Sequence, residues 1–190
     1  MTIPVQSYKR PARWIHWLMA LCIIPMIPAG FIMIQEGIPR ALQNTLFLFH
    51  KNMGSLLLLL IVVRLLYRWR NPAPAEPAHL PDWQVKVAAL THWLLYALLV
   101  VMPLSGYIRV RAGGFPIEAL DALGVPALVP RSDQLAAVAK DVHLFAGYAI
   151  AGLVAMHIAA ALHHAVIKRD GVFSRMWVTP ASRARRDAAE

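Results

Sequence analysis

Histidines are the residues of this chain that could best perform chemistry. Four of them lie within one apolar stretch, "HLFAGYAIAGLVAMHIAAALHH", at residues 143 to 164. Ionisable groups at membrane depth are energetically costly and usually mark a functional site. His143 and His157 are fourteen positions apart, which in an α-helix corresponds to about −40° of net rotation and about 21 Å of rise. The two imidazoles therefore share one helix face near opposite ends, and this spacing indicates two stacked sites.

The composition indicates the elements that must position these histidines. The chain has 190 residues, of which 58% are hydrophobic, whereas soluble domains have about 45–50%. Runs of about 20 apolar residues are long enough for a helical membrane span. The sequence therefore predicts an all-α integral membrane protein with one domain over residues 1–190. Its four-helix transmembrane bundle is expected at about residues 14–34, 45–66, 87–110 and 143–167.

The charges predict how this bundle is oriented. The N-terminus, the connection between the second and third runs, and the tail (residues 168–190), together with Arg64 at the end of the second run, carry 13 of the 19 lysines and arginines. All six tryptophans also lie on this side of the predicted bundle. Because lysine and arginine favour the cytoplasmic side, we expect both termini in the cytoplasm and the long loop 111–141 outside. The net charge of +9 is thus a topology signal, and no nucleic-acid partner is expected.

The remaining histidines can be matched to these two by depth. His50 falls at the depth of His143, and His16 and His92 both fall near the depth of His157. A zinc site needs three or four ligands around one ion, whereas these imidazoles form pairs. A haem takes two axial ligands from opposite sides, and the absence of a CxxCH motif excludes covalent c-type haem. The pattern predicts two bis-histidine b-type haems, and a haem-free proton-coupled transporter is the alternative.

Several short motifs together resemble one known family. The segments "RPARWIHWLMA", "FHKNMGSLLLLLIVVRLLYR", "THWLLYALLVVMPLSGY" and "VHLFAGYAIAGLVAMHIAAALHH" are similar to the bacterial cytochrome b561 family. The type it resembles most is superoxide oxidase, a superoxide:ubiquinone oxidoreductase. The resemblance implies ligands from the first, second and fourth helices. It therefore pairs His16 with His157, the inner pair, and His50 with His143, the outer pair.

The resemblance also implies the partners of these haems. It suggests superoxide and ubiquinone as substrates and a redox partner protein as a further partner. It also suggests the bacterial inner membrane as the location. The alternative within the family fold is a quinone-reactive cytochrome b subunit of a periplasmic dehydrogenase or hydrogenase. Quinone reduction needs a hydrogen-bond donor and protons, which a histidine near the cytoplasm can supply. His164 continues the helix face of His157 and is the first candidate, and His92 is the second.

Cationic side chains complete the expected site. Guanidinium and ammonium groups bind carboxylates well, so Arg13, Arg64 and Lys51 are the candidates for the haem propionates. A positive field at the outer side could attract a small anion. The residues expected to steer superoxide there are Arg109, Arg111, Arg131 and Lys140.

Overall fold

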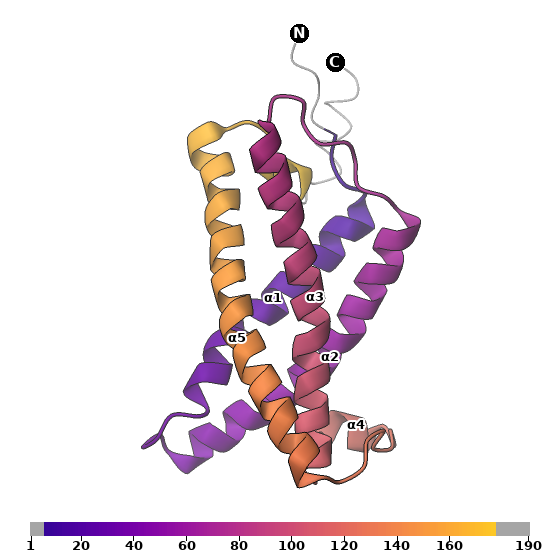
Figure 1. The fold of residues 1–190 in the computed structure, drawn as a ribbon, viewed down its shortest axis with the longest axis vertical. Coiled ribbons are helices and arrows are strands. Elements are labelled where there is room, and N and C mark those ends of the chain that lie inside the picture. Colours follow the sequence, from indigo (N-terminus) through magenta and orange to yellow (C-terminus); the bar gives the residue numbers. More distant parts are fainter. Residues whose placement is uncertain (1–5, 178–190) are drawn as a thin grey trace.

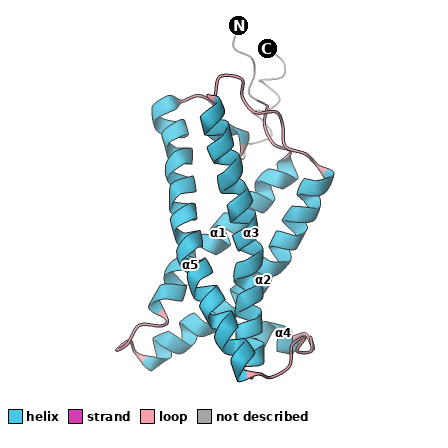
Figure 2. Cartoon of the chain, viewed as in Figure 1, coloured by secondary structure: helices cyan, strands magenta, loops and turns pink. Residues whose placement is uncertain are grey.

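The fold is a bundle of long helices. The computed structural model describes residues 6–177 and contains no strand in that range (Figure 2). Four of its helices are long and apolar enough to cross a membrane. They are α1 (Arg10–Ile32), α2 (Arg40–Arg70), α3 (Asp82–Ala112) and α5 (Asp133–Leu162), the last continuing as a π-helical turn, His163–Lys168 (Figure 1). The predicted fold class is therefore confirmed.

The helices extend beyond the apolar runs that predicted them. α5 begins at Asp133 rather than at His143, because the Ser132 hydroxyl accepts a hydrogen bond from the Leu135 amide at 3.2 Å and caps the helix. The outer loop, expected over residues 111–141, therefore occupies only residues 113–132. A short helix, α4 (Glu118–Ala122), lies within this loop. Of the predicted tail, residues 178–190 lie outside the described residues.

Two pairs of helices form the bundle. α1 packs against α2, and α3 packs against α5, while α3 also contacts α2. The interface between α1 and α2 is a buried cluster of Cys22, Met26 and Leu57. α1 and α5 do not pack closely along their length. Consequently, side chains that reach from α1 or α2 to α5 connect one helix pair with the other.

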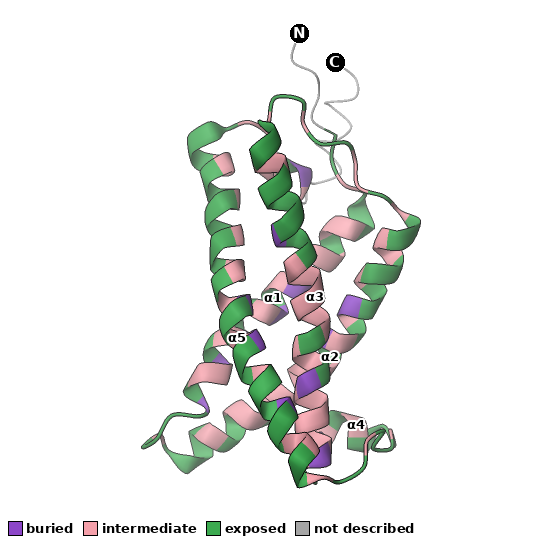
Figure 3. Ribbon diagram, viewed as in Figure 1, coloured by how far each residue is buried: buried purple, intermediate pink, exposed green. Residues whose placement is uncertain are grey.

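Large apolar side chains cover the outside of the bundle. Leu21 is 72% exposed and Phe145 is 71% exposed, and few residues on the long helices are buried (Figure 3). A soluble protein rarely exposes so many large apolar residues in contiguous patches. These side chains are suited to contact with lipid, as expected for a multi-pass membrane protein.

Three connections meet at one end of the bundle, which we call the basic end. The Tyr8 amide donates to the Arg175 carbonyl at 3.0 Å, so the first and last described segments are adjacent. The buried Arg175 guanidinium binds the Glu76 carboxylate at 2.8 Å and the carbonyls of Pro74 and Ala75. This end therefore joins the chain before α1, the α2–α3 connection and the chain after α5. The charge distribution predicts that these three basic segments lie on the same side of the bundle.

Candidate functional site

The outer pair connects the two helix pairs. The ring centres of His50, on α2, and His143, on α5, are 6.0 Å apart and the ring planes meet at 79°. A metal between two imidazoles, each bound at about 2 Å, would separate the ring centres by roughly 6 Å. The predicted pairing of these two residues therefore has a geometry that fits an iron between them.

Glycines provide the space for both outer rings. A β-carbon on Gly30 of α1 would lie 3.0 Å from Cε1 of His50, and one on Gly106 of α3 would lie 2.9 Å from Cε1 of His143. Such distances are too short for ordinary packing. Gly106, which ends the "PLSG" of the third apolar run, therefore allows the His143 ring to lie directly against α3.

A backbone hydrogen bond orients His143. Its Nδ1 lies 2.9 Å from the Met102 carbonyl, and the Ser105 hydroxyl also approaches Nδ1 at 3.3 Å. Because a carbonyl can only accept, Nδ1 carries the hydrogen and Nε2 is left as the metal-binding nitrogen. His50 has a weaker counterpart, since the Met26 carbonyl is within reach of its ring but forms no well-aligned bond with its Nδ1.

The inner end brings three imidazoles together. His16, on α1, and His157, on α5, have ring centres 6.2 Å apart at 80°. His92, on α3, lies 5.5 Å from His157 at 70°. The structure thus places both sequence-predicted candidates next to His157. However, α3 and α5 belong to the same helix pair, whereas His16 faces His157 from the other pair, as His50 faces His143.

Two arginines lie beside the inner imidazoles. Arg64 stacks on the Tyr96 ring at 5.6 Å and is within electrostatic reach of His16 and His157. Together with Arg68 it lines a small cleft at the basic end. This cleft is suited to carboxylates of a group bound at the inner pair. Arg13, the other inner candidate, donates to the Trp177 carbonyl at 2.8 Å, so it also holds the segment that follows α5.

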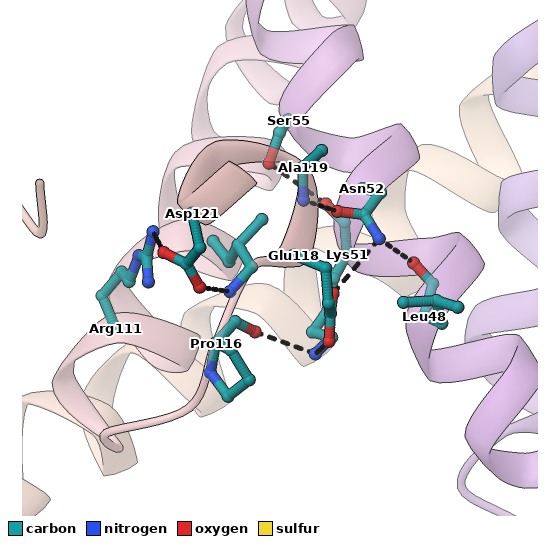
Figure 4. Close-up of polar contacts among 10 residues, drawn as sticks. Leu48, Lys51, Asn52, Ser55, Arg111, Pro116, Glu118, Ala119 and Asp121 are labelled. Atoms are coloured by element: carbon teal, nitrogen blue, oxygen red, sulfur yellow. Dashed lines mark hydrogen bonds and ion pairs between the residues drawn. The ribbon is translucent and has the colours of Figure 1, made fainter. Parts of the chain in front are cut away.

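Lys51 is engaged by the outer loop. Its ammonium group contacts a Glu118 carboxylate oxygen at 2.6 Å and the Pro116 carbonyl at 2.8 Å (Figure 4). Asn52 donates to the other carboxylate oxygen at 3.2 Å and accepts from the Ala119 amide at 2.8 Å. α4 is thereby fixed to α2. A propionate at Lys51 would have to share the ammonium group with the Glu118 carboxylate and the Pro116 carbonyl.

Arg109 lies nearest to the outer pair among the proposed steering residues. It is one turn beyond Gly106 and two turns beyond Met102 on the same face of α3, and both of these residues contact His143. It is within electrostatic reach of His50 and His143. By contrast, Arg111 forms an ion pair with Asp121 at 2.5 Å. The other two contact neither ring: Arg131 packs on Gly114, and Lys140 is exposed.

His164, the predicted quinone ligand, is near the basic end in the π-helical turn. Its Nδ1 lies 2.6 Å from a carboxylate oxygen of Asp170. Sequence reasoning missed Asp170: the "RDG" that follows α5 signals a turn, but not the π-helical turn that brings this carboxylate back to His164. It also missed Gly30 and Gly106 as contacts of the imidazoles.

Comparisons with known proteins identify the family. The family model for prokaryotic cytochrome b561 matches residues 7–178. The chain belongs to the prokaryotic cytochrome b561 family. It is 30% identical over 162 residues to the cytochrome b561 homolog 2 of Escherichia coli K12, covering 85% of this chain and 86% of that protein. It is 28% identical over 166 residues to the probable superoxide oxidase CybB of Yersinia pestis, covering 85% and 90%.

Membership establishes the general activity of the chain. The prokaryotic cytochrome b561 family comprises membrane electron-transfer proteins that bind b-type haem. The predicted family is confirmed, and the chain is a multi-pass bacterial membrane protein. The imidazole pairs described above are the residues suited to hold such a group, because they provide unbound ring nitrogens between two helix pairs.

Proposed function

We propose that the chain is a superoxide oxidase, which takes electrons from superoxide at the periplasmic end and gives them to ubiquinone at the cytoplasmic, basic end. Two superoxide anions each lose one electron and become O2. One ubiquinone gains two electrons and two protons and becomes ubiquinol. The two imidazole pairs carry this proposal, because they lie one near each end of the bundle with ring centres 6.0 and 6.2 Å apart. The relative named as a probable superoxide oxidase supports it.

Two b-type haems, when bound, would supply one-electron redox centres at the two depths. His50 and His143 would hold the outer haem, and His16 and His157 the inner one. Met102 fixes His143 with its Nε2 unprotonated, and Gly30 and Gly106 leave room for the outer rings. At the inner end, Arg64 and Arg68 line the cleft that would receive propionates.

Arg109 and His164 would serve the two substrates. Arg109 places a positive charge beside the outer pair, where an anion must approach to transfer its electron. His164 lies near the basic end and could bond a quinone carbonyl and supply a proton to the ring. His92 is the second candidate for this role. Both termini would lie in the cytoplasm and the bundle in the inner membrane, because lysine and arginine concentrate at the basic end.

Product analysis tests this function. Purified protein in proteoliposomes containing ubiquinone is supplied with superoxide, and ubiquinol and O2 are measured. The proposal predicts one ubiquinol for every two superoxide anions consumed beyond spontaneous dismutation. Haem reduction by a copurifying periplasmic dehydrogenase, with no ubiquinol formed from superoxide, would instead support the dehydrogenase-subunit alternative.

A further inference from the structure

The chain reverses direction after the π-helical turn that contains His164. α5 passes into a π-helical turn at His163, and the Arg169 amide donates to the His164 carbonyl at 2.8 Å. Arg169 adopts a left-handed conformation with φ of 51°, which is uncommon for a residue other than glycine. Gly171 follows with φ of 82°. These turns fold Asp170 back onto the side chain of His164.

The contact between Asp170 and His164 is short and largely buried. Nδ1 of His164 and Oδ2 of Asp170 are 2.6 Å apart, and the two side chains are 17% and 15% exposed. The other carboxylate oxygen accepts from the Val172 amide at 3.2 Å. Burial acts to raise the pKa of Asp170, but these hydrogen bonds outweigh it and hold the pKa below its ordinary value.

The ionised carboxylate determines which nitrogen of His164 is left for another partner. A carboxylate only accepts hydrogen bonds, so Nδ1 must carry a hydrogen, and Nε2, which carries a second hydrogen in the imidazolium form, is the nitrogen left for another partner. Two further imidazoles surround the pair. Nε2 of His79, in the α2–α3 connection, lies 3.9 Å from Oδ2 of Asp170, and the His163 ring centre is 5.9 Å from that of His164. His79 is half exposed, so the pair lies close to solvent.

We propose that Asp170 is a positioning residue for quinone reduction, which fixes His164 so that its Nε2–H is presented to the quinone. This inference rests on the proposed function. The Nε2–H bond breaks and an O–H bond forms on the quinone carbonyl oxygen as the quinone takes up electrons that derive from superoxide. His164 changes from imidazolium to neutral imidazole, and its Nδ1–H remains bonded to Asp170. Solvent, which reaches the half-exposed His79 beside the pair, returns a proton to Nε2.

The variant Asp170→Asn tests this role. Asparagine keeps the size of the side chain and an oxygen for the Val172 amide, but it removes the negative charge that stabilises the imidazolium, the form of His164 that can give a proton from Nε2 and keep Nδ1–H. We expect unchanged haem content and unchanged haem reduction by superoxide. The maximal rate of haem reoxidation by ubiquinone-1 should fall roughly 100-fold, as for the loss of a positioned proton donor, with little change in the half-saturating concentration. Asp82→Asn, an exposed carboxylate at the start of α3, is the charge-matched control and should react normally.

A double variant distinguishes positioning from general structural damage. If Asp170 acts through His164, adding Asp170→Asn to His164→Ala should slow reoxidation no further. The proposal is overturned if the double variant slows reoxidation by the product of the two single effects. It is also overturned if Asp170→Asn raises the half-saturating quinone concentration and leaves the maximal rate unchanged. Should Asp170→Asn fail to bind haem, Asp170→Glu keeps the charge but moves the oxygen. An intermediate maximal rate in that variant supports positioning, and a normal rate contradicts it.

The two levels of the proposal fail differently. If His164→Ala reoxidises normally with ubiquinone-1, the quinone does not bind beside His164, and the placement of the quinone in the proposed function is wrong. If His164→Ala is slow while Asp170→Asn is normal, the quinone placement stands and only the role of Asp170 is refuted.

Discussion

Gly106 of α3 and His143 of α5 are in direct contact, because a β-carbon at position 106 would lie 2.9 Å from Cε1 of the imidazole. Gly106→Ala should therefore displace the ring. In the haem-free chain the ring can swing aside, but a ring bound to iron cannot do so without losing its ligand geometry. We expect lower occupancy of the outer haem and a shifted reduction potential, measured by a pyridine haemochrome assay and a redox titration.

Gly152→Ala is the matched control, because no atom lies within 4 Å of a β-carbon at that position of α5. A helical Gly→Ala change alone favours folding by about 0.5–1 kcal/mol, so this control should bind both haems normally. Full occupancy of the outer haem and an unchanged reduction potential in Gly106→Ala would show that the His143 ring does not need its present position.

The imidazole pairs predict which variants lose which haem. His50→Ala or His143→Ala should remove the outer haem, and His16→Ala or His157→Ala should remove the inner one, because each loses an axial ligand. The fully loaded chain should contain two haems and each single variant about one. Redox titration of the variants identifies which of the two centres remains.

His92 provides the sharpest check on the inner pair. Its ring is nearer to His157 than that of His16, but it comes from the helix pair that already carries His157. His92→Ala should leave both iron centres six-coordinate and low-spin in electron paramagnetic resonance. A high-spin inner centre in this variant would mean that His92, and not His16, is the ligand.

The sequence was sufficient to predict the four spans and to match His50 with His143 by depth. Apolar length predicts the four spans, and helix geometry places His143 and His157 on one face. The ends of the helices were less predictable, because capping by Ser132 and helix-forming residues extend α5 beyond its apolar core. Depth alone also left His16 and His92 as equal candidates, since choosing between them requires knowledge of which helices pack together.

Contacts that depend on how the chain folds beyond the ends of the helices were not predictable. Lys51 follows a histidine and was expected to bind a propionate, but its contact with Glu118 depends on how the outer loop folds back onto α2. Asp170 reaches His164 only because of a π-helical turn and a left-handed Arg169. Neither conformation follows from hydrophobic periodicity, which specifies the face of a helix but not how the chain continues after it.

Arg109 should govern the encounter with superoxide. Arg109→Gln removes the charge beside the outer pair, so we expect slower haem reduction by superoxide and a weaker dependence of that rate on ionic strength. Arg40→Gln, at the start of α2 near the same end of the bundle, is the control and should react normally. Equal effects of the two substitutions would mean that only the net charge of this end matters.

Acidification should release α4 from α2, which it contacts through Glu118, and from α3, which it contacts through Asp121. The hydrogen bond from Arg111 lowers the pKa of Asp121. Burial acts to raise the pKa of Glu118, but bonds from Lys51 and Asn52 outweigh it and lower this pKa as well. Because both pKa values are depressed in the folded state, the stabilisation is present at neutral pH and is lost as the pH falls below about 4.

Hydrogen exchange measures this release. Amides of residues 117–122 should be protected near neutral pH and lose protection, after correction for the intrinsic exchange rate, on acidification below about pH 4. Glu118→Gln should weaken this protection at neutral pH and reduce its dependence on pH. Constant protection across the acid range would show that the ion pairs do not hold α4 in place.

Stopped-flow spectroscopy of the haem-loaded protein tests the central claim most directly. A pulse of superoxide is mixed with oxidised protein in the absence and presence of ubiquinone-1, and the haem absorbance is followed. We predict rapid reduction of both haems without quinone, and reduction followed by reoxidation with it, accompanied by formation of ubiquinol. Failure of superoxide to reduce either haem, in protein that dithionite reduces fully, would contradict the proposed function.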